Sequence, residues 1–429
     1  MFINTIIGRF QLLLSPIYTK SIILQNIDRF IGFSIFCVIF SSLFTQSDNI
    51  GYFALLAILL TTIKILTKTG EKFELTGADK FLLLYFIIVL ISVAGSSLLY
   101  LSLKGFFKTL TYLGFYISVL HYLKDNKDII KYIFLAIAFC ASYETVFAFL
   151  QNFGAVEEIS GWQDMTRLNP EEVMTRVYGT IKPYNPNLFG GYMLSILPSF
   201  IVLPTINKKL IPTSIILGLL SCIALILTGC RGAYIGLFIE IIALFIITYK
   251  FLKQTYKKAF LIITGVLTAF ITMIIISTTA LRARIFSIFA MRSDSSNSFR
   301  FNVYNSCIQM FKDNWLLGIG CGNQNFREIY GLYMKTGFDA LSAYNIYLEI
   351  AVESGIFALI AFVGFIFCNL YKAIKYILNS ESTNVLFVGA ALISIIGMLT
   401  HGIVDTVFFR PQIQFVFWIM IAIIRTLTK

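Results

Sequence analysis

The sequence predicts an all-α integral membrane protein, and its composition and apolar runs carry this prediction. Of 429 residues, 58% are hydrophobic and only 13% are charged, so the chain lacks the polar surface that a water-soluble protein of this length needs. The apolar runs are long, and few of them alternate as the strands of a membrane barrel do. Because a helix satisfies its own backbone hydrogen bonds inside lipid, we expect a bundle of spanning helices.

About twelve apolar runs approach the ~20 residues that a membrane span needs. An even number of spans places both termini on the same side of the membrane. The runs are centred near Phe36, Leu59, Ile88, Leu113, Ala141, Leu197, Leu220, Ile241, Thr268, Phe362, Ile393 and Ile419.

These runs divide the chain into helical and loop segments. Residues 1–29 are expected to form a retained interfacial helix rather than a cleaved signal peptide, because no small-residue cleavage pattern is present. The predicted segments that follow are helices 1–5 (30–150), an outward loop (151–187), helices 6–9 (188–281), a large outward loop (282–347) and helices 10–12 (348–429).

The basic residues predict which side of the membrane each loop faces. The termini and the links at 64–80, 124–131, 207–209, 250–258 and 372–375 hold 20 of the 34 lysines and arginines, and the other loops hold 14. Positive charge accumulates in short cytoplasmic loops, so the first set should be cytoplasmic. This topology also explains the net charge of +12 better than nucleic-acid binding does.

Arginine is concentrated on the outward side. Nine of the 14 outward basic residues are arginine, against three of the 20 cytoplasmic ones. Lysine suffices as an inside anchor, whereas the planar fork of arginine suits phosphate or carboxylate. The set therefore indicates an outward anion site, although any single member could equally serve loop solubility or a local salt bridge. The nine are Arg167, Arg176, Arg231, Arg282, Arg284, Arg292, Arg300, Arg327 and Arg410.

Two of these arginines lie at junctions between a loop and a helix. Arg176 precedes a turn-rich stretch in which Asn187 either positions a ligand or caps the sixth spanning helix. Arg231 lies in a link so short that it must sit at the membrane boundary. There an arginine needs a partner or a water-filled cavity, and snorkelling to the surface is the alternative.

Acidic side chains supply candidate proton acceptors. Glu144 and Glu240 lie within predicted spans, where they either relay protons or pair with a buried arginine. Asn345, Glu349 and Glu353 are spaced four apart and so share one helical face. That face holds a general base or pairs with the outward arginines.

The last outward turn contains His401, Asp405 and Arg410. These residues could shuttle protons at the membrane edge, or His401 and Asp405 could form a capping pair. The chain has only two histidines, and no Cys, His and carboxylate spacing near them indicates a zinc site. We therefore expect no metal.

These stretches, in this order, resemble the O-antigen ligase and polymerase superfamily of bacterial membrane proteins. The resemblance covers the chain from about residue 160 to its end. The matching motifs are Arg176-Val-Tyr-Gly-Thr with Asn185-Pro-Asn, Thr228-Gly-Cys-Arg-Gly, Gly318-Ile-Gly, Asn345-Ile-Tyr-Leu-Glu and Glu353-Ser-Gly. Within the superfamily, residues 296–300, 340–344 and 401–412 are similar to a cyanobacterial branch that is named for inorganic carbon accumulation and labelled as bicarbonate transporters.

The resemblance implies a glycosyltransferase-C-like bundle in the cytoplasmic (inner) membrane, with both termini cytoplasmic and the large loop periplasmic. It also implies that arginines, here Arg176, Arg231 and Arg300, bind the diphosphate of a polyprenyl-linked glycan. A loop histidine just before the Asn345 position is the implied base. This chain has Tyr344 there, and tyrosine is a poor base near neutral pH because its reference pKa is ~10.

The favoured function is transfer or polymerisation of a glycan from a polyprenyl-diphosphate donor to an acceptor glycan or glycolipid, without metal, nucleotide or other cofactor. One alternative is a bicarbonate transporter or an accessory of its uptake, although no inverted repeat supports it. A second is a glycolipid binder without turnover. The candidate catalytic residues are Glu349, His401 and Tyr344, and the candidate substrate-positioning residues are Asn187, Asn345, Asp405 and Arg410.

Overall fold

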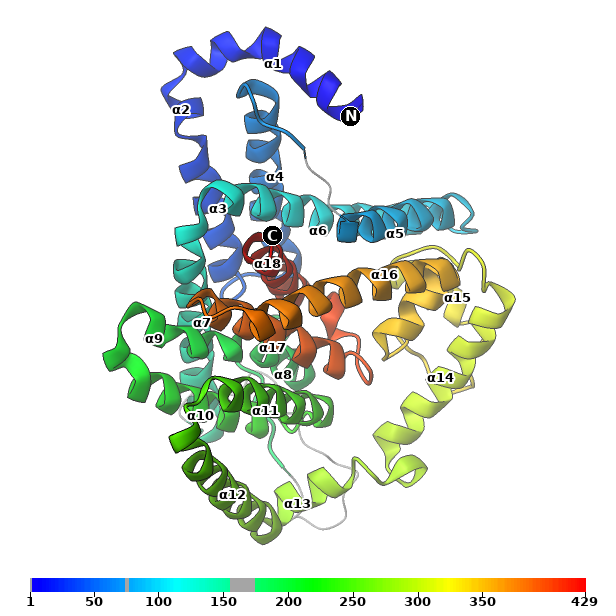
Figure 1. Ribbon diagram of the computed structural model, residues 1–429. Helices are drawn as coiled ribbons and strands as arrows, with labels where there is room; N and C mark the ends of the chain where they lie inside the picture. Colours follow the sequence, from blue (N-terminus) through cyan, green and yellow to red (C-terminus); the bar gives the residue numbers. More distant parts are fainter. Residues whose placement is uncertain (1, 74–76, 155–173) are drawn as a thin grey trace.

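The computed structural model describes residues 2–73, 77–154 and 174–429, and it contains helices and turns but no strand in these ranges. Figure 1 shows the arrangement. The helices before the large predicted loop are α1 (Phe2–Lys20), α2 (Ile22–Gln25), α3 (Ile27–Ser41), α4 (Ile50–Thr67), α5 (Gly77–Ala94), α6 (Leu99–Asp125), α7 (Ile130–Asn152), α8 (Pro186–Ile196), α9 (Leu203–Ile206), α10 (Ile211–Leu227), α11 (Arg231–Phe251) and α12 (Gln254–Ser277).

The remaining third of the chain contains both short amphipathic helices and long apolar ones. The predicted loop 282–347 is itself folded, since most of α13 and all of α14 and α15 lie within it. These helices are α13 (Thr279–Phe286), α14 (Ser295–Asp313), α15 (Asn323–Tyr330), α16 (Ile346–Asn379), α17 (Asn384–His401) and α18 (Pro411–Leu427).

The structure confirms the prediction of an all-α polytopic membrane protein. In the described ranges, nine helical segments are long and apolar enough to cross a membrane. Each predicted apolar centre falls within a helix, and the three centres outside those nine segments belong to α3, α6 and the shorter apolar helix α18. The nine are Ser47–Thr67, Gly77–Ala94, Lys127–Asn152, Pro186–Ile206, Lys208–Leu227, Arg231–Phe251, Gln254–Ser277, Ile346–Asn379 and Asn384–His401.

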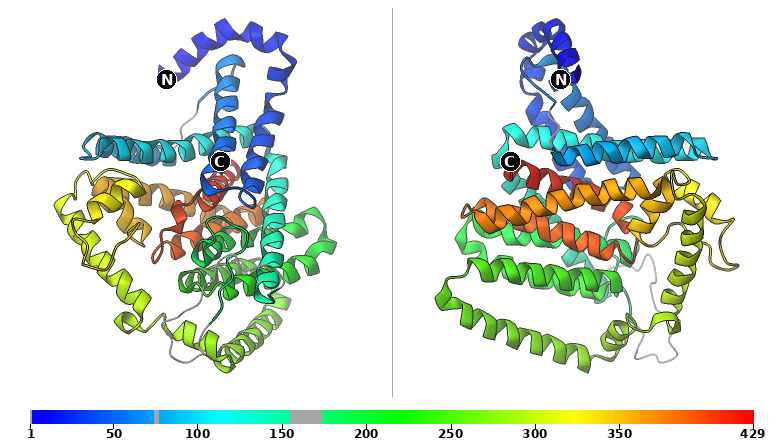
Figure 2. Two further views of the ribbon diagram at one scale, coloured as in Figure 1. Left: turned by 180° about the vertical axis from the view of Figure 1, so that it is seen from behind. Right: turned by 45° about the vertical axis from the view of Figure 1, so that its right-hand side comes forward.

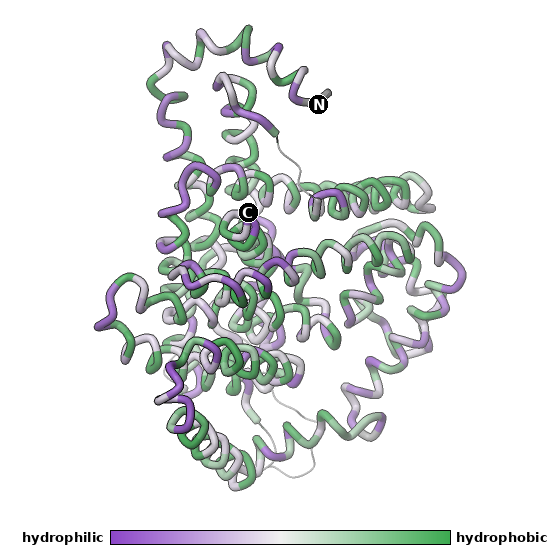
Figure 3. Tube along the Cα trace, in the orientation of Figure 1, coloured by the Kyte–Doolittle hydropathy of each residue, from purple (hydrophilic) through white to green (hydrophobic). Residues whose placement is uncertain are grey.

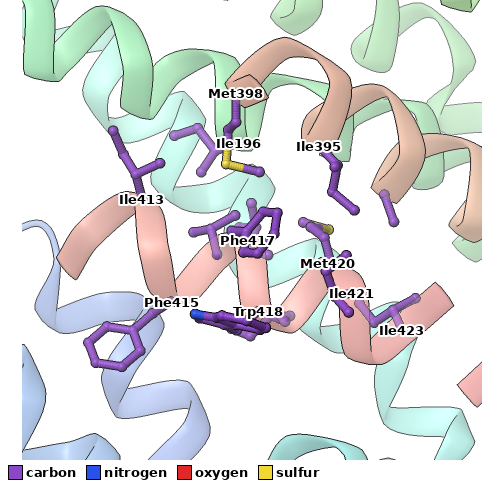
Figure 4. Packing of buried hydrophobic residues seen from close by; sticks show 14 of the residues in the cluster. Ile196, Ile395, Met398, Ile413, Phe415, Phe417, Trp418, Met420, Ile421 and Ile423 are labelled. Carbon is purple, nitrogen blue, oxygen red and sulfur yellow. The ribbon is translucent and has the colours of Figure 1, made fainter. Parts of the chain in front are cut away.

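Helix α18 forms the centre of the bundle. Every residue from Pro411 to Thr426 is buried, because α6, α8, α16 and α17 pack around it. Figure 4 shows Phe417 and Met420 of α18 beside Met398 of α17. A helix that is mainly apolar on all sides suits either a protein core or lipid, and α18 lies in the core. The turn that precedes α18 is therefore held at a fixed position.

Helix α12, unlike the buried helix α18, lies on the rim of the molecule. None of its residues is buried, and Figure 2 shows it beneath α11 at the end of a stack that also contains α16 and α17. Figure 3 shows α12 as mainly hydrophobic, whereas the α14 segment mixes hydrophilic and hydrophobic residues. An apolar helix without burial suits contact with lipid.

The segment 282–347 is attached to α16 by backbone hydrogen bonds. Ile319 N donates to Val352 O at 3.0 Å, and Ile356 N donates to Trp315 O at 2.9 Å. The backbones approach so closely that a Cβ on Gly355 would clash with the Leu316 carbonyl oxygen. Gly355 also has φ 78°, which suits glycine and bends α16 at this point. These contacts place α15 and the start of α16 side by side.

Candidate functional site

Two arginines from distant parts of the sequence are connected to one carboxylate, Arg300 directly and Arg176 through Asn187. Arg176 Nη2 donates to Asn187 Oδ1 at 2.6 Å, and Asn187 Nδ2 donates to Asp405 Oδ2 at 3.1 Å. Arg300 Nη2 lies 3.7 Å from that same Asp405 oxygen. We call these four residues the Asp405 network. It joins the start of α8, the helix α14 and the turn before α18.

The N-terminus of α8 explains why the Asn187 side chain is available to this network. Asn185 caps the helix, because its Oδ1 accepts the backbone N–H groups of Asn187 at 2.7 Å and Leu188 at 3.3 Å. The alternative interpretation of Asn187 as the cap is therefore wrong. The side chain of Asn185 caps α8, whereas the side chain of Asn187 connects the start of α8 to the turn before α18.

Two further arginines lie at the N-terminus of α11. Arg231 Nη1 is 2.9 Å from Asp294 Oδ1 and donates to the backbone and side-chain oxygens of Ser287, both at 3.1 Å. Arg284 Nε donates to the Gly229 carbonyl at 2.7 Å. Only 8% of the Arg231 side chain is exposed, so it pairs within the protein rather than snorkelling to the surface.

Electrostatics connects the arginines at α11 with the Asp405 network. Burial first, and then the positive charge of Arg284, lower the pKa of Arg176 to about 10, with Cys230 and Tyr234 opposing. Such a shift means that another positive charge is close and that the charged form is desolvated. The N-termini of α8 and α11 add the positive ends of two helix dipoles. An anion bound here would be stabilised by all of these groups.

His401 lies close to this cluster but is enclosed. Its Nε2 is 3.5 Å from Cys230 Sγ, and only 2% of the residue is exposed. Two glycines pack against the ring: a Cβ would come within 2.9 Å of it at Gly191 and within 2.6 Å at Gly232. His401 thus contacts the backbone of α8 and α11 rather than an open space.

Tyr344, which occupies the position of the implied histidine, adopts a left-handed backbone with φ 50°, a conformation that bulky residues rarely take. The Arg300 guanidinium lies 5.8 Å from its ring centroid, and Tyr304 Oη donates to its carbonyl at 3.1 Å. Burial raises the pKa of the Tyr344 phenol, and the charge of Asp405 raises it further, with Arg300 opposing. The phenol therefore stays protonated at neutral pH and cannot serve as a base there.

A cavity of about 810 Å³ opens on the other side of the 405–410 turn. We call it the main cavity. Glu349 and Glu353 of α16 line it, as does Arg410, and the rest of its wall comes from α5, α6, α15, α18 and several connecting segments, among them 46–48 and 182–184. Arg176, Arg231, Arg300 and His401 do not line it. The predicted site residues are thus divided between an arginine cluster and a cavity that holds carboxylates.

The shared face predicted for residues 345, 349 and 353 is present at the start of α16. Asn345 caps the helix by accepting the Tyr347 and Leu348 N–H groups, and its Nδ2 donates to Ile403 O at 2.9 Å. One turn later, Glu349 Oε2 accepts the Ala343 N–H at 3.0 Å. Asn345 therefore joins α16 to the turn after α17.

Glu353 lies one further turn along the same face. Its Oε1 accepts the Gly322 N–H at 3.0 Å, so it attaches α16 to the start of α15. Glu349 and Glu353 each retain a second carboxylate oxygen, and both side chains line the main cavity. Two carboxylates therefore stand within one cavity wall.

The two intramembrane acids have different surroundings. Glu144 accepts hydrogen bonds from Thr180 N at 2.9 Å and from Thr180 Oγ1 at 2.5 Å, so it holds the segment that follows Arg176. No arginine of the described ranges pairs with Glu144. Both oxygens of Glu240 are buried without a hydrogen-bond partner in the described part of the chain, and the carboxyl packs on Gly397.

Two lysines of the main cavity, Lys104 and Lys108 of α6, were not among the residues predicted from the sequence. Their spacing of four residues within an otherwise apolar run was the available signal, because it places both on one helical face. Of the nine arginines predicted to face outward, Arg167 lies outside the described residues. Arg292 and Arg327 contact other partners: Arg292 lies 5.6 Å from the Phe301 ring centroid, and Arg327 pairs with Asp339 at 3.0 Å.

Comparison with known families addresses the central part of the chain. A family model described as O-antigen ligase matches residues 216–363, a stretch that begins in α10 and ends in α16. The match confirms the resemblance to the O-antigen ligase and polymerase superfamily. The resemblance to the cyanobacterial branch stays a prediction. No curated protein matches the chain. The matched stretch contains Arg231, Arg284, Arg300, Tyr344 and Glu349.

Proposed function

We propose that this O-antigen ligase-type membrane protein transfers a glycan from a polyprenyl-diphosphate donor to an acceptor hydroxyl on the outward side of the membrane. The observation that carries this proposal is the meeting of Arg176, Arg231 and Arg300 near two helix N-termini, since the three come from separate segments. A departing diphosphate develops negative charge, and preorganised guanidinium groups stabilise it.

The arginine cluster retains capacity for such a ligand. Arg300 Nε is buried and has no hydrogen-bond partner in the described ranges. Asp405 and Asp294 balance part of the charge of Arg300 and Arg231. A diphosphate brings more negative charge and more acceptor oxygens than these carboxylates, so it would bind the same guanidinium groups bidentately.

An apolar groove suits the lipid part of the donor. It has a volume of about 860 Å³ and lies between α11 and α12, lined mainly by apolar residues that include Phe245, Leu261 and Ile276. At its outer end, Arg282 Nη1 donates to the Ile276 carbonyl at 2.7 Å. The polyprenyl chain would occupy the groove while the diphosphate turns toward α13 and its arginines. This arrangement matches an amphipathic ligand that enters from the membrane.

Glu349 is the group best placed to receive the acceptor proton. It lines the main cavity and keeps one carboxylate oxygen free of backbone contact, whereas Tyr344 is protonated and His401 is enclosed. In the proposed step, the acceptor oxygen forms a bond to the anomeric carbon as its proton moves to Glu349. The bond from that carbon to the diphosphate oxygen breaks, and the diphosphate leaves with the electron pair to the arginine cluster.

Purified protein in detergent, incubated with a polyprenyl-diphosphate oligosaccharide and a glycan acceptor, tests the proposal. The Arg231→Ala variant should lose transfer by about 100-fold or more, the range for removal of one preorganised donor. Arg29→Ala, which removes an exposed arginine from the cytoplasmic set, should retain wild-type activity. Unchanged transfer by Arg231→Ala would reject the assignment.

A folding control is needed because Arg231→Ala leaves Asp294 without its ion-pair partner. The double variant Arg231→Ala/Asp294→Asn removes both charges, and it should be as inactive as the single variant while its unfolding temperature stays closer to that of wild type. The bicarbonate alternative stays a prediction. Uptake of labelled bicarbonate into proteoliposomes above that of empty vesicles would favour it.

A further inference from the structure

The main cavity carries more positive charge than a proton acceptor requires. Its basic side chains come from four separate places in the fold, so their convergence is a product of tertiary structure. Three carboxylates, those of Asp48, Glu349 and Glu353, line the same space. The basic residues are Lys104 and Lys108 of α6, Lys182 before α8, Arg327 of α15 and Arg410 before α18.

Three of these five cations form no ion pair with the residues that the structure describes. In the described part of the chain, the side chains of Lys104, Lys182 and Arg410 make no ion pair or hydrogen bond. Lys108 pairs with Asp48 at 3.0 Å, and both side chains are exposed, so the pair contributes little. The cavity therefore keeps positive potential that a ligand of opposite charge would neutralise.

The position of two of these residues is set by contacts that do not use their charged ends. The Lys182 carbonyl accepts hydrogen bonds from Ser47 Oγ and Gln412 Nε2, both at 2.7 Å. Gln412 is the second residue of the buried helix α18, and Arg410 directly precedes that helix. The backbones of Lys182 and Arg410 are thus held in place, while the charged ends of their side chains remain open to the cavity.

The rest of the cavity wall suits sugar rings. Tyr112, Tyr184 and Trp418 line it, and Trp418 Nε1 donates to Gln414 Oε1 at 2.8 Å, which fixes the indole. Aromatic side chains offer apolar faces with a polar edge, a combination that packs against the mixed surface of a saccharide. A volume of about 810 Å³ falls in the usual range for a ligand site and holds a short oligosaccharide.

We propose that the main cavity is the acceptor site and that its ligand is an acidic saccharide, whose carboxylate or phosphate groups bind Lys104, Lys182 and Arg410 while a hydroxyl faces Glu349. The assignment of the bound glycan as acceptor rests on the proposed function, whereas the binding itself does not. The 405–410 turn separates two anion sites, since Asp405 contacts the donor arginine Arg300 whereas Arg410 lines the acceptor cavity. A neutral glycan leaves the three cations unpaired, so charge selects the acceptor.

Equilibrium binding of a fluorescent tetragalacturonate to the detergent-purified protein tests this proposal without requiring turnover. Binding should be at least about 10-fold tighter than that of the same oligosaccharide after its carboxyl groups are reduced to alcohols, and it should weaken as salt rises because the charges are screened. Lys104→Gln, Lys182→Gln and Arg410→Gln should each weaken binding of the acidic form by about 3- to 10-fold. Equal binding of both forms by the wild-type protein would overturn the proposal.

Lys335→Gln is the matched control, since Lys335 is exposed on the large segment and does not line the cavity. It should bind both oligosaccharides as wild type does. If Lys335→Gln lost as much affinity as Lys182→Gln, the preference would reflect overall charge, and the proposed site would be wrong.

Two further arms separate this proposal from the proposed function. Inorganic pyrophosphate should bind the donor arginines and leave tetragalacturonate bound. If pyrophosphate instead displaced tetragalacturonate from the wild-type protein but not from Lys182→Gln, the main cavity would be the diphosphate site and the proposal would be overturned. In the transfer assay, Arg231→Ala should lose product with both acceptors. Normal transfer by that variant, with the acidic preference intact, would reject the donor assignment and leave the acidic-saccharide site supported.

Discussion

Asn187 and Asp405 lie 218 positions apart in the chain, and a hydrogen bond of 3.1 Å joins Asn187 Nδ2 to Asp405 Oδ2. This bond ties the start of α8 to the turn before α18. Arg176 lies on one side of it and Arg300 on the other, so the relative position of the two arginines depends on it. Loss of the bond should therefore affect donor binding more than any other step.

Asn187→Ala should raise the KM for the lipid-linked donor by about 10-fold and lower kcat by less than about 3-fold. Both arginines remain in the variant, but they lose the bridge that spaces them for a diphosphate, and a small misplacement weakens binding of an oriented ligand. Steady-state kinetics with varied donor measures this effect. Asn207→Ala removes the comparable side chain that caps the turn before α10, and it should leave KM unchanged. A loss of folded protein at constant KM would instead show that Asn187 has only a structural role.

Glu349→Gln and Tyr344→Phe should have opposite outcomes. Removing the general base lowers kcat by about 100-fold or more, because positioned proton transfer contributes about that much. Tyr344→Phe keeps the ring that packs beside Arg300 and removes a phenol that stays protonated, so transfer should remain within about 3-fold of wild type. Transfer rates at saturating donor measure both effects. A large loss in Tyr344→Phe with none in Glu349→Gln would move the base to position 344.

Gly355→Ala should destabilise the protein by about 2 kcal/mol or more. Its φ of 78° strains any residue with a Cβ, and that Cβ would meet the Leu316 carbonyl oxygen. The change would separate α16 from the segment that leads to α15. Thermal or denaturant unfolding in detergent measures this cost. Gly218→Ala is the control, because a Cβ at that position would have no atom within 4 Å, and the substitution should be neutral or slightly stabilising.

Lys64→Met should destabilise the predicted cytoplasmic end of the bundle by about 1–3 kcal/mol, less than the loss of one partner from a fully buried ion pair, because the carboxylates left behind are partly exposed. The Lys64 ammonium is completely buried, 2.7 Å from Asp28 Oδ1 and 3.2 Å from Asp125 Oδ2. Removing it leaves those carboxylates facing one another. Unfolding in detergent measures the loss, whereas Lys20→Met at an exposed position of α1 should have no effect. Equal stability of the two variants would contradict the role of this pair.

The same end of the bundle should lose stability in acid. Burial by itself raises the pKa of the Glu71 carboxyl, but the hydrogen bond from Lys68 and the charge of Lys64 outweigh it, so the pKa lies below its usual value. Such a group stabilises the folded state fully above its unfolded pKa, near ~4.5, and this contribution is lost as pH falls toward the lower folded pKa. The unfolding temperature should therefore drop below pH ~4.5, and Glu71→Gln should reduce the drop.

Composition and apolar run length were sufficient to predict the helical class and the approximate position of each spanning helix. These properties follow from local hydrophobicity, because lipid contact requires an apolar helix wherever it occurs along the chain. The spacing of Asn345, Glu349 and Glu353 was also readable, since helical geometry relates residues four apart. Which asparagine caps α8 was not readable, because asparagine is a common cap at either position and the Asn187 Oδ1 atom instead accepts a hydrogen bond from Arg176 Nη2.

The order of residues alone is enough to predict a polytopic membrane bundle, and it also predicts that arginines suited to an anion face outward. Which of these residues act together depends on how the helices pack. Packing places Arg176 and Arg300 around Asp405, encloses His401 between two glycines, and opens a separate cavity where Lys104 and Arg410 face Glu349. The physical reason is that burial and charge pairing are properties of space rather than of sequence. Residues hundreds of positions apart become buried together or form ion pairs only after helices such as α18 have packed.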